Sequence, residues 1–242
     1  LLRDRVGLRH PQAIAILRAT CSLRREQGQL DAAEDDCRQA LELALEVRGA
    51  QHRDTVDARR QLAALLVDNG RLGEAEVIFR DAHAWLVSRL GERHTDVARN
   101  ANSMAIVAWE RGDLDAAIRG LDGANATWRA LGNEALLAAG LFNQALVLHE
   151  AGDDARAARQ LEESLRLRSA HFGDDHGIVG ATLRLAGEVA ASRGRDAEAL
   201  AALRRAVALT SADYGAAHPI TRRAELALAR FEASRGSPGA MA

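Results

Sequence analysis

Histidine is the residue in this chain that most invites a catalytic or metal-binding interpretation, because five of the eight histidines recur in one motif. Each of the five stands three residues after a glycine, in stretches such as "GLRHPQ" and "GAAHPI". They are His10, His52, His94, His176 and His218. A shared metal would need its ligands about 2 Å away, whereas equivalent positions on packed helices lie at least about 8–10 Å apart. We therefore expect these histidines to have a structural role.

Other side chains with catalytic potential do not form a convergent set. His149 and Glu150 are neighbours, and neighbours on a helix point about 100° apart, so they do not meet at one substrate atom. Asp174, Asp175 and His176 lie at the recurring junction and lack the spacing of metal ligands. We find no phosphate-binding glycine loop, His-Glu-x-x-His pair or serine elbow. The sequence thus predicts a non-enzymatic protein with no cofactor and no metal.

The two cysteines, Cys21 and Cys37, are too few for a disulfide framework or a thiolate zinc site. They fall in columns occupied by core residues elsewhere in the chain, so we expect them to pack in the core of the first repeat. The sequence shows no signal peptide and no apolar run of about 20 residues. These features predict a cytoplasmic protein without membrane contact.

The composition favours helices and argues against a nucleic-acid partner. Hydrophobic residues make up 48% of the 242 positions, but aromatic residues only 3%, so the core must consist of Ala, Leu and Val. The formal net charge is −2, without the basic surface expected of a nucleic-acid binder.

Two interleaved glycine series divide the chain into helix-length segments. The first series is Gly7, Gly49, Gly91, Gly132, Gly173 and Gly215. The second is Gly28, Gly70, Gly112, Gly152, Gly194 and Gly236. Successive members lie 40–42 residues apart, which is the signature of a repeat architecture. The segments between them carry apolar residues at steps of three and four, as amphipathic helices do.

Fixed columns of small and large residues accompany the glycines. Five residues after the second-series glycine stand Ala33, Ala75, Ala117, Ala157 and Ala199. Nine residues after it stand Cys37, Phe79, Leu121, Leu161 and Leu203. Small residues let two helices approach closely, and the large column fills the layer between repeats.

These columns resemble the tetratricopeptide repeat in its 42-residue, kinesin-light-chain-like form, best in residues 102–118 and 217–230. The resemblance implies an all-α fold, a right-handed α-solenoid of antiparallel helix pairs. We expect a single domain over 1–242. Its parts would be the end of a truncated helix at 1–6, repeats at about 7–48, 49–90, 91–131, 132–172 and 173–214, a capping helix at 215–235 and a tail at 236–242.

The recurring motif then becomes a junction between repeats. The glycine is placed where an outer helix ends, a position that favours left-handed backbone. The histidine begins the next inner helix, with Pro11 or Pro219 in its first turn in two of the copies. The fourth junction, "GNEALL" from Gly132, lacks the histidine and is shorter. With Gly120 and Gly123 nearby, the stretch 119–140 is expected to be the least stable helical region, with a flexible joint as the sharper hypothesis.

In this family the inner helices line a concave groove that binds peptides or protein segments. The resemblance places these residues in the groove: Arg60, Gln61, Val67, Asn102, Ser103, Ile106, Trp109, Phe142, Asn143, Leu146, His149, Arg184, Glu188 and Arg230. Trp85 and Trp128 belong to outer helices and are expected to pack between repeats. The asparagine pair of kinesin light chains is only partly present, so we do not expect the same class of peptide.

The function predicted from these features is a protein-interaction scaffold, a module of a larger signalling or regulatory protein. Trp109 and Phe142 would hold an apolar anchor of the partner, and Arg60, Arg184 and Arg230 would pair with acidic flanks. The alternative is a self-association module, acting through the stretch 1–6 or the capping helix. Partners would be proteins or peptides rather than nucleic acids or membranes.

Overall fold

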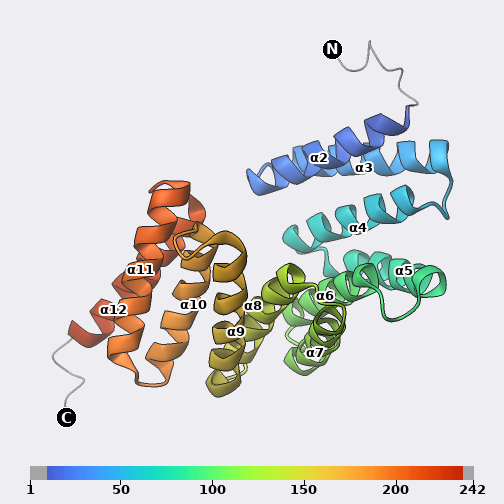
Figure 1. Ribbon diagram of the computed structural model, residues 1–242. Coiled ribbons are helices and arrows are strands. Elements are labelled where there is room, and N and C mark those ends of the chain that lie inside the picture. Colours follow the sequence, from blue (N-terminus) through green and yellow to red (C-terminus); the bar gives the residue numbers. More distant parts are fainter. Residues whose placement is uncertain (1–9, 237–242) are drawn as a thin grey trace. The chain divides into compact units, whose positions relative to one another are not determined.

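The computed structural model describes residues 10–236, and the regular structure in that range is entirely helical (Figure 1). Eleven α-helices follow one another through links of three or four residues. Their bounds are α2 (Pro11–Glu26), α3 (Leu30–Arg48), α4 (Arg53–Asp68), α5 (Leu72–Leu90), α6 (Thr95–Glu110), α7 (Leu114–Ala130), α8 (Glu134–Glu150), α9 (Asp154–Phe172), α10 (Gly177–Ser192), α11 (Asp196–Tyr214) and α12 (Pro219–Gly236). The all-α solenoid of antiparallel helix pairs predicted from the sequence is confirmed.

The helices form two compact units that divide between Asp113 and Leu114. Within each unit, consecutive helices pack against one another. The even-numbered helices also contact the next even-numbered helix, α2 with α4 and α4 with α6 in the first unit, α8 with α10 and α10 with α12 in the second. The even-numbered helices are therefore the inner layer of each unit, and the odd-numbered helices are the outer layer.

The recurring histidines begin the inner helices, as predicted. In each described copy the imidazole Nδ1 accepts a hydrogen bond from the backbone N–H two residues later, at 3.0–3.2 Å. His10, His52, His94 and His176 are the N-caps of α2, α4, α6 and α10, and His218 makes the same contact before α12. An N-cap side chain satisfies one of the unpaired N–H groups of a helix start, which is typically worth about 1 kcal/mol.

The junction glycines have positive φ, as predicted, but the rest of their conformation differs from the left-handed helical region. Gly49 has φ 79° and ψ 167°, and Gly215 has φ 84° and ψ 158°. This extended region with positive φ is accessible almost exclusively to glycine. It lets the chain leave the outer helix abruptly and reach the histidine cap within four residues. Glycine is therefore required more strictly at these junctions than at a left-handed helix end, where asparagine is sometimes found.

The junction at Gly132 differs in kind from the other repeat junctions. Gly132 N–H donates to Arg129 O and Asn133 N–H donates to Trp128 O. Gly112 and Asp113, in the turn between α6 and α7, make the same two types of bond. Gly132 thus forms the compact three-residue turn that the second glycine series forms, although its position in the sequence placed it in the first. Asn133 replaces histidine as the N-cap, accepting from Leu136 N–H at 3.3 Å.

The predicted columns form the core. Every member of the small column is 0% exposed, and the members of the large column are 0–1% exposed. Trp128 is buried and Trp85 packs against the cluster around Leu86, so the packing role predicted for both tryptophans is confirmed.

The cysteines are core residues, but they are not free thiols. Cys21 of α2 and Cys37 of α3 are 0% and 1% exposed and form a disulfide, with their Cα atoms 5.4 Å apart. This bond was not expected from the sequence, because two isolated cysteines form no framework pattern. The repeat geometry supplies the reason. Cys21 stands seven residues before Gly28, at a position where the next inner helices have the small residues Ala63 and Ala105, and this position lies against the large column of the adjoining outer helix.

Parts of the predicted organisation fall outside the described residues, namely the helix end at 1–6, the first glycine at Gly7 and most of the tail at 236–242. The single domain over 1–242 and its repeat bounds remain a proposal.

Candidate peptide-binding surface

The predicted groove residues lie on the inner helices of both units. Arg60 and Gln61 lie on α4, and Asn102, Ser103, Ile106 and Trp109 lie on α6, all in the first unit. Phe142, Asn143, Leu146 and His149 lie on α8, Arg184 and Glu188 on α10, and Arg230 on α12, all in the second unit. The structure therefore groups these side chains into two sets, one in each unit.

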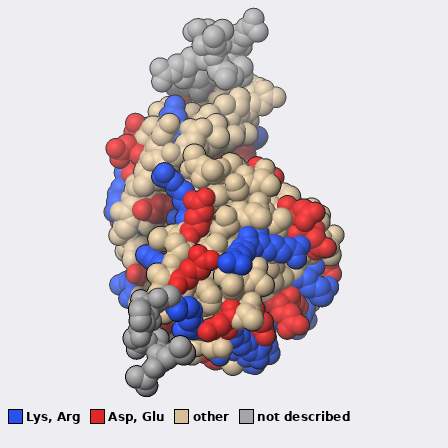
Figure 2. Space-filling model, turned by 90° about the vertical axis from the view of Figure 1, so that its left-hand side faces the viewer, with Lys and Arg blue, Asp and Glu red and all other residues tan. Residues whose placement is uncertain are grey.

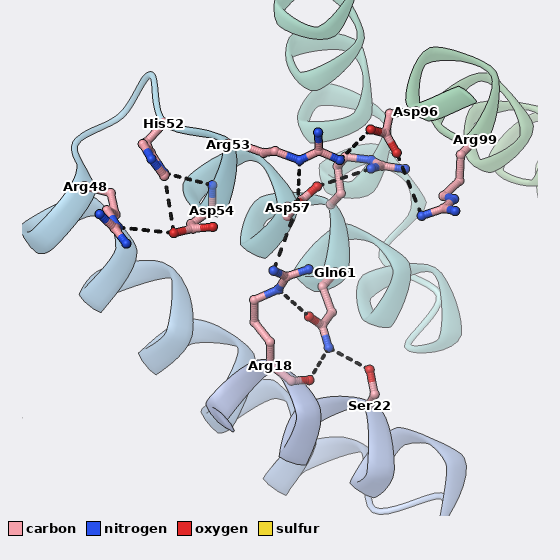
Figure 3. A network of polar contacts seen from close by, with 11 residues as sticks. Arg18, Ser22, Arg48, His52, Arg53, Asp54, Asp57, Gln61, Asp96 and Arg99 are labelled. Carbon is pink, nitrogen blue, oxygen red and sulfur yellow. Dashed lines mark hydrogen bonds and ion pairs between the residues drawn. The ribbon is translucent and has the colours of Figure 1, made fainter. Parts of the chain in front are cut away.

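In the first unit, polar side chains link each inner helix to the next (Figure 3). Gln61 accepts from Arg18 Nε at 3.1 Å, and its amide nitrogen donates to Arg18 O at 2.5 Å and to Ser22 Oγ at 2.8 Å. Arg53 reaches Asp96 Oδ2 at 2.5 Å. The residue pairs Arg18–Gln61 and Arg53–Asp96 are each 43 positions apart, close to the repeat length. The repeat therefore builds a polar ladder by placing corresponding turns of neighbouring helices side by side.

Arg60 is held inside this ladder. Its side chain is 11% exposed, its Nε donates to Asn100 Oδ1 at 3.0 Å, and its NH1 lies 3.5 Å from Asp57 Oδ1. Burial lowers the pKa of Arg60, and the Asp57 carboxylate opposes that shift. Asp57 also lies 4.0 Å from Arg18 and 3.7 Å from Arg53. The charge of Arg60 is thus compensated within the chain.

The first unit also has a small surface hollow at the C-terminal ends of α2 and α4. Ser22, Arg25, Glu26 and Asp68 line it, and Arg25 forms an ion pair with Asp68 across it. Its lining is entirely polar or charged, so it offers no apolar anchor point.

The apolar members of the predicted set are partly buried rather than enclosed. Ile106 and Trp109 are partly exposed on α6. Phe142 and Leu146 pack against the core cluster around Ala145, Leu148 and Leu185, and both keep part of their surface accessible. Partly buried apolar side chains on a polar surface are typical of the anchor positions of interfaces.

The remaining polar members in the second unit make local contacts. His149 Nδ1 lies 2.5 Å from Asp154 Oδ1, and Asp154 Oδ2 accepts from Ser192 Oγ at 2.6 Å. Partial burial works against ionisation of Asp154, but the hydrogen bonds from Ser192 and His149 prevail and lower its pKa. Arg184 forms an ion pair with Glu188 at 2.5 Å, one turn further along α10. Arg230 is exposed on α12.

The structure adds one residue that the sequence analysis did not select, Arg168 on α9. Its NH1 donates to Thr182 Oγ1 at 2.5 Å and lies 3.4 Å from Ile178 O, and its guanidinium carbon stands 4.8 Å above the centre of the Phe142 ring. Arg168 is only 7% exposed. The corresponding position in the other outer helices holds Ala44, Leu86, Trp128 or Thr210. A charged residue in that otherwise apolar or uncharged column was the signal available in the sequence.

On the face that Figure 2 shows, acidic and basic side chains are interspersed rather than gathered by sign. Between residues 10 and 236, no three His, Cys, Asp or Glu side chains are grouped as metal ligands. No helix in that range combines the length and hydropathy that a bilayer crossing requires.

These features define a helical-repeat solenoid whose inner helices carry the candidate site. Two segments, residues 12–86 and 136–212, match the family model described as the tetratricopeptide repeat. They cover more than half of the chain, which belongs to the tetratricopeptide repeat family. Domains of this family are generally interaction modules and typically non-catalytic.

Solved structures show the same fold at low sequence identity. The BtubC (BKLC) protein from P. vanneervenii has a TM-score of 0.67 at 24% identity, covering 81% of this chain and 79% of its own. The kinesin-light-chain TPR-like repeats of Podosopora anserina have a TM-score of 0.65 at 16% identity, covering 84% and 97%. PlcR from Bacillus thuringiensis, solved with the peptide PapR7 and DNA, has a TM-score of 0.69 at 13% identity, covering 93% and 75%. No curated protein matches the sequence significantly.

Proposed function

We propose that this chain is a non-enzymatic scaffold that binds a peptide or protein segment on its inner helices. The observation that carries the proposal is that the inner helices of each unit leave apolar side chains partly exposed, Ile106 and Trp109 in the first unit and Phe142 and Leu146 in the second. Aromatic residues in such settings supply a large share of binding energy at interfaces. The similar fold of PlcR, solved with a bound peptide, gives further support.

The ligand we propose is a segment with an apolar anchor and acidic flanks, contributed by a protein partner in the same signalling or regulatory system. We propose that Arg184 and Arg230 bind carboxylates beside the apolar residues of the second unit, and that Arg184 exchanges Glu188 for the ligand. Arg60 has the same predicted role, but it already forms an ion pair with Asp57 of its own helix. We propose no nucleic-acid, membrane or cofactor partner.

The test compares partner capture by the wild-type chain and by Trp109→Ala and Phe142→Ala, alone and together. Val77→Ala is the matched control, because Val77 is a 53% exposed apolar residue on an outer helix. Partners are identified by mass spectrometry, and Kd is measured for the shortest binding segment. We expect each aromatic substitution to weaken binding by about 2 kcal/mol or more, about 30-fold, with Val77→Ala near wild type. Equal affinity of the folded double variant and wild type would refute this assignment.

Self-association is a second candidate function, favoured by one observation on α2. Ile16 and Leu23 are 37% and 54% exposed. Their counterparts one repeat later, Ala58 and Leu65, are 1% and 0% exposed and lie in clusters with residues of α3. A second copy of the chain would cover this face of α2. Sedimentation would then show a concentration-dependent dimer that Leu23→Glu abolishes, and a concentration-independent monomer mass would exclude it.

We also propose a cytoplasmic setting, and the disulfide makes that proposal testable. Disulfides are rare in reducing compartments. Alkylation of the intact protein in freshly lysed cells should label both Cys21 and Cys37 if the chain resides in the cytosol. A fully oxidised pair in vivo would place it in an oxidising compartment.

A further inference from the structure

Arg168 is a buried cation without a carboxylate partner among the described residues. Its recorded partners are a hydroxyl, a backbone carbonyl and an aromatic ring. A guanidinium has five N–H donors, and these contacts occupy only NH1. Burying an ion without a counter-ion costs free energy unless another group compensates it.

The three partners come from three helices and fix where the guanidinium lies. Phe142 is on α8, Arg168 on α9, and Thr182 and Ile178 on α10. Arg168 therefore extends from an outer helix to a position between two inner helices, against the ring of Phe142. That ring is partly exposed, so the fixed cation lies next to the apolar anchor point proposed above.

Electrostatics agree with an uncompensated charge. Burial lowers the pKa of Arg168 to about 10, and the phenol of Tyr214 is the group that opposes the shift. At neutral pH the side chain remains a cation. Arg184 on α10 occupies the position that corresponds to Phe142 one repeat later. It differs from Arg168 because it has a carboxylate partner, Glu188, at 2.5 Å.

From this geometry we infer that Arg168 and Phe142 form a carboxylate-binding subsite, in which the free N–H groups of Arg168 bind an Asp, Glu or C-terminal carboxylate of the ligand while Phe142 packs against an adjacent apolar side chain. Charge-assisted bonds from a planar guanidinium to a carboxylate are among the strong hydrogen bonds of proteins. A carboxylate at this point would supply the counter-ion that the fold does not. The inference rests on the proposed function and names the chemistry of one subsite.

The test uses two neutral-backbone probes that differ only in their charge, acetyl-Leu-Glu-amide and acetyl-Leu-Gln-amide. Each is titrated into the whole chain while NMR follows the Nε–H of Arg168 and the ring of Phe142. We expect the Glu probe to shift both signals and to bind at least about 5-fold more tightly than the Gln probe. Arg168→Met should reduce that preference to about 1, and Arg168→Lys, which keeps the charge but not the fork, to an intermediate value.

The matched control is Arg166→Met, which removes the same charge from an exposed position two residues away on α9. It should leave the preference unchanged. The inference is overturned if Arg168→Met keeps the wild-type preference, if Arg166→Met loses it equally, or if the wild-type chain does not distinguish the probes at up to about 20 mM. If Arg168→Met does not fold, the preference of Arg168→Lys for the Glu probe over the Gln probe tests the inference instead. Partner capture with Trp109→Ala and Phe142→Ala is independent of this result, so the subsite can fail while the scaffold function stands.

Discussion

Two arginines that are largely removed from water, one in each unit, face opposite electrostatic situations. Arg60 on α4 and Arg168 on α9 are both largely removed from water, and burial lowers the pKa of both. Arg60 has Asp57 and Asn100 beside it, whereas Arg168 has Thr182, a carbonyl and the Phe142 ring. The first unit uses its buried cation to join repeats, and the second leaves its cation open to an external counter-ion. The largely buried arginine therefore serves structure in one unit and, as we propose, recognition in the other.

The largest expected effect concerns the disulfide, a covalent link that the described residues contain only in the first unit. Reduction of Cys21–Cys37 should lower the stability of that unit by about 3 kcal/mol, as expected for a closed loop of about 15 residues. Urea unfolding followed by hydrogen exchange resolves the units, and protection should fall in α2 and α3 rather than in α9–α11. The variant Cys21→Ala/Cys37→Ala should not respond to reductant. Equal loss of protection in both units would contradict a local role for the bond.

The next effect tests the compensation of Arg60. Asp57→Ala removes the carboxylate that lies within 4.0 Å of Arg18, Arg53 and Arg60. Leaving a largely buried arginine uncompensated should cost about 2–3 kcal/mol, somewhat below the full penalty for a completely buried pair because Asp57 is 20% exposed. Asp57→Asn keeps an acceptor and isolates the loss of charge. A change below about 0.5 kcal/mol in urea unfolding would show that solvent already compensates Arg60.

The layered fold could be predicted from the sequence because the determinants of the repeat are local. A glycine such as Gly49 and a capping histidine such as His52 occur at every regular repeat junction, so the five copies identify the junction from the sequence. The junction at Gly132 shows what the spacing of glycines does not predict. Gly132 kept the expected spacing, but its turn type depends on the link length and on Asn133, which a spacing pattern does not resolve.

The site was harder to predict, because it depends on contacts between repeats. Gln61 and Arg60 were selected by column, yet their partners Arg18 and Asn100 come from other helices. Arg168 was missed because the candidate residues were selected on inner helices, whereas Arg168 reaches Phe142 from an outer helix. The cysteine pair was missed because pairing depends on the distance between two helices rather than on either residue.

A smaller effect tests the irregular contact between α7 and α8 in the second unit. A Cβ at Gly140 would lie 2.1 Å from Asn125 Oδ1 and 2.5 Å from the Trp128 ring, whereas one at Gly123 would meet nothing within 4 Å. Gly140→Ala should therefore destabilise the unit by about 1–2 kcal/mol through overpacking. Gly123→Ala should stabilise it by about 0.5–1 kcal/mol, because glycine is costly inside a helix. Unchanged melting of Gly123→Ala would remove the idea that this region is a weak point.

The smallest expected change in stability is that of Arg168→Met, and it distinguishes the uncompensated Arg168 from the compensated Arg60. Arg168→Met removes a buried charge that has no carboxylate to lose, so the cost of burying the ion disappears together with one hydrogen bond and the contact with Phe142. These terms are similar in size, because a buried ion replaced by an apolar residue of like volume is often neutral or stabilising, and a cation–π contact contributes about 0.5–2 kcal/mol. The free energy of unfolding should then change by less than about 1 kcal/mol, against the larger loss for Asp57→Ala. A loss above about 2 kcal/mol for Arg168→Met in urea unfolding would contradict an uncompensated guanidinium, because such a loss would mean that the contacts of Arg168 stabilise the fold by more than burial of its charge costs.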